Sequence, residues 1–99
     1  MRLTKKQHQL IKAIVSRVVG PDSRVWLFGS RVDDAKRGGD IDLLVEIGRP
    51  VANRAGILCK LEGALVMALG NRKMDVLLKD GRTQDAPIFH AARQKGVLL

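Results

Sequence analysis

The chain has 99 residues, of which 45% are hydrophobic and 28% charged, and its formal net charge is +8. This apolar content excludes a disordered chain, and the length fits one small globular domain, which we assign to residues 1–99. No apolar run in the sequence is long enough to span a membrane and no signal-peptide core follows Met1, so we expect a cytoplasmic protein that does not enter a membrane.

The first 28 residues predict a helix followed by a strand. Thr4 and Gln7 have the spacing of a capping box, and apolar residues then recur every three or four positions, so we expect a helix from Thr4 to Val19. Gly20-Pro21 ends that helix. A strand is expected at Arg24–Phe28, and because it is apolar on both faces it should be covered on both sides.

Gly29-Ser30 follows this strand directly and is a candidate phosphate-binding turn. Glycine lets the backbone turn sharply and lets a ligand approach it, while a serine hydroxyl and neighbouring N–H groups are donors for phosphate oxygens. A nine-residue loop from Arg31 to Gly39 comes next. Its basic side chains are further candidates for contact with phosphate: Arg31, Lys36 and Arg37.

The next strand, expected at Asp40–Ile47, opens with two carboxylates. Because side chains alternate along a strand, Asp40 and Asp42 share one face and stand roughly 6.6 Å apart. Aspartate is depleted in strands, and this position in an otherwise apolar strand is poorly explained by folding alone. The spacing suits a pair of metal ions about 3.5 to 4 Å apart, although two solvated carboxylates at a strand end are the simpler alternative.

The second half of the chain predicts helix, strand and helix. A helix is expected at Val51–Leu69, with glycines at 56 and 63 explained by close packing against another surface. A third strand is expected at Lys73–Leu78, again with one acid, Asp75, near its start. After a turn at Lys79–Arg82, Asp85 should cap a helix over Pro87–Lys95, which leaves an apolar tail. The apolar stripe expected on the long helix consists of Ala55, Leu58, Leu61, Leu65 and Leu69.

Other candidate groups have simpler interpretations. Cys59 lies within a helical pattern as a small apolar residue. His8 and His90 have no ligand partner at a suitable spacing, so we expect His8 at the surface and His90 either at the surface or packed against its neighbours. The basic residues of the first helix favour polyanions such as nucleotide, RNA or an acidic protein, or they simply form a solvated face.

The order of these features resembles the nucleotidyltransferase superfamily of DNA polymerase β, in particular its minimal nucleotidyltransferases. The shared pattern is an apolar strand, Gly29-Ser30, a short loop, Asp40-x-Asp42 and a third carboxylate, here Asp75, on a later strand. The chain departs from many members at Val32–Asp34 and at Gly39, which affects the phosphate contacts expected by analogy. The resemblance implies an α/β (α+β) fold with a small mixed sheet of about three strands packed with helices.

By this resemblance, Asp40 and Asp42 would hold two Mg²⁺ ions and Asp75 would complete the site beside the acceptor hydroxyl. Gly29, Ser30 and Arg31 would bind the nucleoside triphosphate, most readily ATP. Minimal members of the superfamily pair with small helical HEPN-domain proteins in toxin–antitoxin modules, which implies that an AMP is attached to such a partner. The alternatives are a catalytically silent protein that neutralises its partner by contact, and an RNA-binding module, which the chain's few aromatic residues support only weakly.

Overall fold

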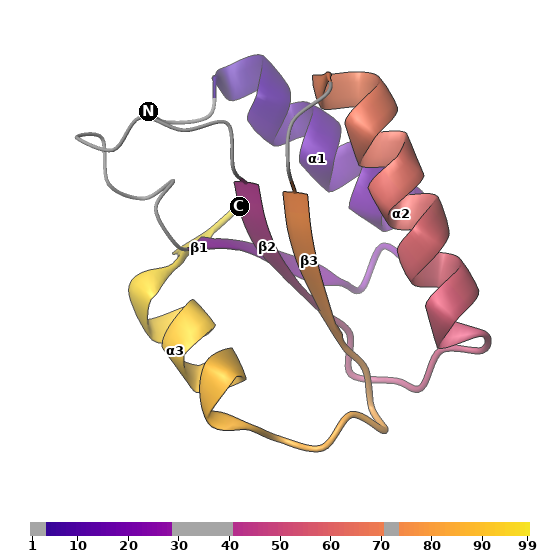
Figure 1. The fold of residues 1–99 in the computed structure, drawn as a ribbon, viewed down its shortest axis with the longest axis vertical. Helices are drawn as coiled ribbons and strands as arrows, with labels where there is room; N and C mark the ends of the chain where they lie inside the picture. The colour runs from indigo at the N-terminus through magenta and orange to yellow at the C-terminus, as the bar shows by residue number, and fades with distance from the viewer. Residues whose placement is uncertain (1–3, 29–40, 71–73) are drawn as a thin grey trace.

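The computed structural model describes residues 4–28, 41–70 and 74–99, which are arranged around one mixed sheet (Figure 1). The strands in these segments run in the order β3-β2-β1-β4. β2 is parallel to β3 and antiparallel to β1, and β4 is antiparallel to β1. The predicted α+β class and mixed sheet are confirmed. The strands are β1 (Arg24–Phe28), β2 (Ile41–Glu46), β3 (Met74–Lys79) and β4 (Val97–Leu98).

β4 is the addition that the sequence did not predict. Val97 and Leu98 pair with Leu27 and Trp26 of β1, and the Leu99 N–H donates to the Val25 carbonyl. The tail was expected only as an apolar end, because a two-residue strand has too few positions to show an alternating pattern. Gly96 makes this pairing possible, since a Cβ there would collide with the carbonyl oxygens of Ala92 and Leu27.

Helices α1 (Lys5–Val18) and α2 (Arg54–Leu69) cover one face of the sheet (Figure 1). The predicted capping box at Thr4 and Gln7 is present. The layer between these two helices and the sheet is the main core. Burying one leucine, isoleucine or valine side chain there contributes about 1.5 to 3 kcal/mol relative to leaving it exposed. The fully buried side chains of this core are Ile11 and Val15 of α1, Ile41, Leu43 and Val45 of β2, and Leu61 and Leu65 of α2.

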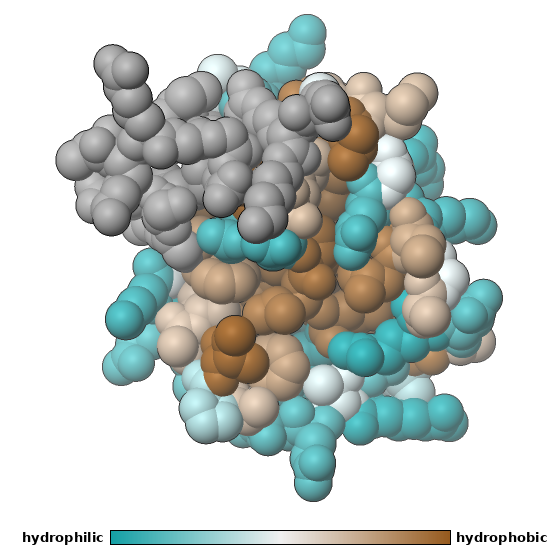
Figure 2. Space-filling model, in the orientation of Figure 1, coloured by the Kyte–Doolittle hydropathy of each residue, from teal (hydrophilic) through white to brown (hydrophobic). Residues whose placement is uncertain are grey.

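Helix α3 (Pro87–Lys95) packs on the opposite face and covers only part of it. Phe89 and Ala92 of this helix pack on Leu44 of β2 and bury it. Trp26 and Leu77 are partly buried against the same cluster. In the view of Figure 2, apolar side chains gather over the middle of the molecule and polar side chains lie around them. Within the described segments, no helix has the length and apolar character needed to cross a membrane.

One predicted helix start and one predicted helix cap are wrong. α2 begins at Arg54 and not at Val51, because the Asn53 side chain caps it by accepting the Gly56 N–H, while the Val51 N–H is held by the Asp80 carboxylate. Ala55, in the first turn, is therefore exposed and not part of the buried stripe.

At α3 the cap is Ala86, with no side-chain hydrogen bond, and not Asp85. The Asp85 carboxylate binds the Nε2 of His90 instead, at 2.7 Å, and accepts the N–H of Ala86. Both residues of this pair are exposed, which is one of the two alternatives expected for His90, but the pairing itself was not predicted.

The two glycines inside α2 do not mark packing against another surface. At Gly56 a Cβ would collide with the side chain of the capping Asn53, which belongs to the same helix. At Gly63 a Cβ would meet nothing within 4 Å. The expectation of close packing is therefore wrong at Gly63, which lies on the exposed side of the helix.

Candidate active site

Asp42 and Asp75 lie side by side at one edge of the sheet. They are register partners on the parallel strands β2 and β3. Parallel partners project to the same face from strands about 4.8 Å apart. Asp42 is half-buried and Asp75 exposed, so the two carboxylates stand together at the rim of the sheet.

The end of β1 reaches the same edge. Phe28, its last residue, is the register partner of Asp42. In the sequence, Phe28 is followed directly by Gly29 and Ser30, the candidate phosphate-binding turn. The other sequence-predicted site residues lie outside the described residues: Gly29, Ser30, Arg31, Lys36, Arg37 and Asp40.

The carboxylate pair lies next to a row of apolar side chains on the same face of the sheet. One step further along the same face, about 6.6 Å away, Trp26, Leu44 and Leu77 are aligned across the three strands. α3 packs on this row through Phe89. Charges beside such a surface interact more strongly than they would in bulk water, which favours binding of a cation between the carboxylates.

The chemistry of the two carboxylates fits a hard cation. Magnesium is bound through one or two carboxylates together with substrate phosphates and water. Asp42 and Asp75 supply two such ligands from rigid neighbouring strands. Within residues 4–28, 41–70 and 74–99, no group of three potential metal ligands comes together, and the predicted third ligand, Asp40, lies outside these ranges.

A second row of charged residues crosses the sheet at its other end. Arg24, Glu46 and Lys79 are aligned by register on β1, β2 and β3. Glu46 accepts a hydrogen bond from Trp26 Nε1 at 2.8 Å and forms an ion pair with Arg93 Nη1 at 2.5 Å. Sequence reasoning missed this row, although the period-two pattern of β2 places Glu46 on the face of Asp42.

Asp80 is the buried charged residue of the described segments, with 4% of its surface exposed. Its carboxylate accepts the Val51 N–H, the Thr83 hydroxyl and the Arg82 N–H. These donors, that of Val51 first, lower the pKa of Asp80 to about 2. The arrangement ties the loop before α2 to the turn after β3, so Asp80 has a structural role.

The Asp85–His90 pair and Cys59 are not part of the carboxylate site. The hydrogen bond from His90 lowers the pKa of Asp85, and both side chains are exposed at the start of α3. Cys59 is exposed on α2, at some distance in sequence from the carboxylate strands.

Comparison with known proteins gives the family of the chain. No match was found among curated proteins. Residues 8–86 match the family model of the nucleotidyltransferase domain, and this range contains the sheet edge with Phe28, Asp42 and Asp75. Because the match covers most of the chain, and the fold is consistent with it, the protein belongs to the nucleotidyltransferase domain family.

Proposed function

We propose that this protein transfers a nucleoside monophosphate, most readily AMP from ATP, to a hydroxyl group of a partner protein. The observation that carries the proposal is the register pairing of Asp42 with Asp75, at the edge where β1 leads into Gly29-Ser30. Transfer of a nucleoside monophosphate from a triphosphate is the reaction of the family. The protein acceptor and the preference for adenine are the further steps of the proposal.

In the proposed reaction the acceptor oxygen attacks the α-phosphorus, the bond from that phosphorus to the β-phosphate oxygen breaks, and pyrophosphate leaves. Magnesium bound by Asp40, Asp42 and Asp75 would supply the charge stabilisation that such a displacement needs. We assign the proton of the acceptor hydroxyl to Asp75, and its exposure supports this role. Gly29 and Ser30 are assigned to the departing pyrophosphate, with Arg31 beside them.

A protein acceptor is supported by the surface around the site. The three aromatic residues of the chain, Trp26, Phe28 and Phe89, all lie in the cluster between α3 and the sheet, so they do not form an exposed platform for stacked bases. In Figure 2, apolar side chains gather over the middle of the molecule, and an apolar area of this kind is more typical of a protein contact. By the resemblance, we propose a small helical HEPN-type protein as the partner and an antitoxin role for this chain.

The test is to incubate the protein with the product of the neighbouring gene, as the candidate partner, together with ATP and magnesium, and to measure the mass of that candidate partner. We expect a gain of one or more AMP groups, mapped by fragmentation to a hydroxyl side chain. The matched control is Glu62→Gln, which neutralises an exposed carboxylate on α2 and should leave the modification unchanged.

The competing function is neutralisation by contact without catalysis. It is distinguished in cells that express the partner as a toxin. The transfer proposal expects Asp42→Asn to lose protection while Glu62→Gln keeps it. If Asp42→Asn protects as well as the parent chain and the partner keeps its unmodified mass, the contact-only function is correct.

A further inference from the structure

A pocket of about 650 Å³ lies at the end of the sheet opposite to Asp42 and Asp75, and the proposed function does not use it. Glu46 lines the pocket and lies four residues after Asp42 on β2, which corresponds to about 13 Å along the strand. The volume is in the range of pockets that hold small ligands. The pocket is therefore separate from the candidate active site and large enough for a ligand of its own.

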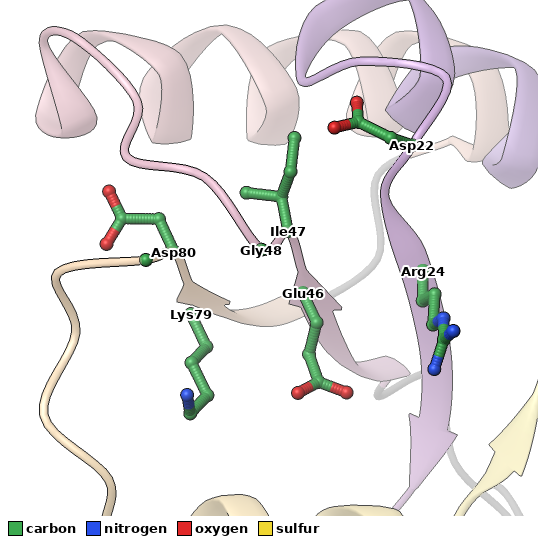
Figure 3. A pocket seen from close by; sticks show the side chains of 8 residues that line it. Asp22, Arg24, Glu46, Ile47, Gly48, Lys79 and Asp80 are labelled. Atoms are coloured by element: carbon green, nitrogen blue, oxygen red, sulfur yellow. The ribbon is translucent and has the colours of Figure 1, made fainter.

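Three charged side chains form the wall of this pocket on the α3 face. Arg24, Glu46 and Lys79 are register partners across β1, β2 and β3. Figure 3 shows their side chains extending to the same side of the sheet, with the two cations on either side of the carboxylate.

The central carboxylate does not neutralise these cations by direct pairing. Both Glu46 oxygens are engaged elsewhere, by Trp26 Nε1 at 2.8 Å and by Arg93 Nη1 at 2.5 Å. Among the described residues, neither Arg24 nor Lys79 has an ion-pair partner. The Lys79 Nζ lies 5.9 Å from the centre of the Phe89 ring, and this cation–π contact orients the ammonium without bringing an anion next to it.

The remaining acids of the pocket are also engaged. Asp22 pairs with Arg49 Nε at 3.1 Å. The Asp80 carboxylate holds the Val51 N–H and, in Figure 3, points away from the side on which Arg24 and Lys79 extend. The charge offered to a ligand on that side is therefore positive.

We infer that this pocket binds a phosphate-bearing anion through Arg24 and Lys79. A guanidinium makes paired hydrogen bonds to phosphate oxygens and an ammonium adds a compact charge. Among the residues that the structure describes, no aromatic side chain lines the pocket, and Gly48 and Gly81 form part of its wall, so the site recognises the phosphate group and not a base. The phosphate can belong to a free anion or to the backbone of a nucleic acid.

The experiment titrates the full chain with pyrophosphate in EDTA, so that no divalent cation supports binding at Asp42 and Asp75. The amide resonances of Gly48 and Gly81 report the location, and fluorescence of Trp26, the single tryptophan, reports the affinity. We expect both amides to shift. Arg24→Gln and Lys79→Gln should each weaken binding about tenfold, the size of one charge-assisted hydrogen bond.

The matched control is Lys60→Gln, which removes an exposed cation on α2 outside the pocket and should leave the affinity unchanged. Thermal unfolding of each variant shows that it is folded. Unchanged affinity in the folded Arg24→Gln and Lys79→Gln variants, or shifts confined to the Asp42 edge, would overturn the inference.

A second arm replaces pyrophosphate with a single-stranded oligouridylate to identify the source of the phosphate. If the nucleic-acid backbone is the ligand, removing both cations should lower the slope of log affinity against log salt by about 1.4, the value for two phosphate contacts. Binding of pyrophosphate alone identifies a free anion, and binding of the oligonucleotide alone identifies a phosphodiester. Absence of binding by both probes contradicts the site.

Discussion

At the scale of single residues, Asp42 and Asp75 are two like charges held next to each other by the register of β2 and β3. Such a pair repels when no cation lies between the carboxylates and binds a cation readily. We therefore expect magnesium to raise the melting temperature of the protein. The increase in stability at a concentration one hundred times the dissociation constant is about 2.7 kcal/mol.

Asp42→Asn and Asp75→Asn should each remove the stabilisation by magnesium without unfolding the protein in EDTA, because the amide relieves the repulsion. The measurement is thermal unfolding with and without the metal, with Glu62→Gln as the control that keeps the response. A full response to magnesium in both aspartate variants would place the cation elsewhere.

Asp80 makes the strongest pH prediction. Its pKa is about 2 in the folded protein, against an ordinary value of 3.8, because the N–H of Val51 and the other donors favour the charged carboxylate. A lowered pKa gives stability that is fully present above the unfolded value and is lost as the pH falls through the folded value. This contribution should therefore disappear between about pH 4 and pH 2.

The comparison that checks it is urea unfolding of the parent chain and Asp80→Asn at a series of pH values. The variant should be less stable than the parent at pH 7, and the difference should shrink as the pH falls through this window. A difference that stays constant down to pH 2 would mean that the charge of Asp80 does not contribute.

At the scale of the elements, α2 carries a glycine at position 63 that its surroundings in the fold do not require. A Cβ at Gly63 meets nothing within 4 Å and the residue lies inside a helix, so Gly63→Ala should stabilise the protein by about 1 kcal/mol. Gly56→Ala is the matched control in the same helix. It should destabilise, because the added Cβ displaces the capping side chain of Asn53.

Chemical denaturation of the two variants tests both statements in one experiment. Equal effects of the two substitutions would show that helix propensity alone decides them. Stabilisation by Gly56→Ala would show that the Asn53 cap contributes little.

The sequence predicts elements well where the pattern is local and long. The capping box of α1, the strand Arg24–Phe28 and the bounds of α3 are found as expected, because repeated apolar spacing and capping residues act within one segment. The start of α2 rests on the local Asn53 cap and also on Asp80, which lies far along the chain and holds the Val51 N–H. β4 depends on pairing with β1, and such long-range contacts are not visible in the segment itself.

The contrast between local patterns and contacts between distant segments also applies to the candidate site. Aspartates at the starts of two strands predicted that Asp42 and Asp75 come together, and parallel pairing in register brings them together. The pocket with Arg24 and Lys79 was not predicted, because those residues read as ordinary surface charges until the register aligns them on either side of Glu46.

At the scale of the whole molecule, the sheet has two chemically different ends. The carboxylates stand where β2 and β3 begin, and the cations stand where these strands end. α3 covers the apolar row between them and is anchored by the Arg93–Glu46 ion pair. One small sheet thus carries two carboxylates at one end and two cations at the other, and the proposals assign cation binding to the first end and anion binding to the second.

Nucleotide transfer at the carboxylate end of the sheet should release pyrophosphate and label the proposed partner in the same reaction. With ATP labelled at the α-phosphate, magnesium and the proposed helical partner, the parent chain should produce labelled partner and pyrophosphate in equal amounts. Asp42→Asn should lower both by about a hundredfold or more, as expected for the loss of a preorganised electrostatic contact, while Glu62→Gln should not. Equal labelling by the parent and Asp42→Asn, or no product from the parent with any nucleoside triphosphate, would contradict the account.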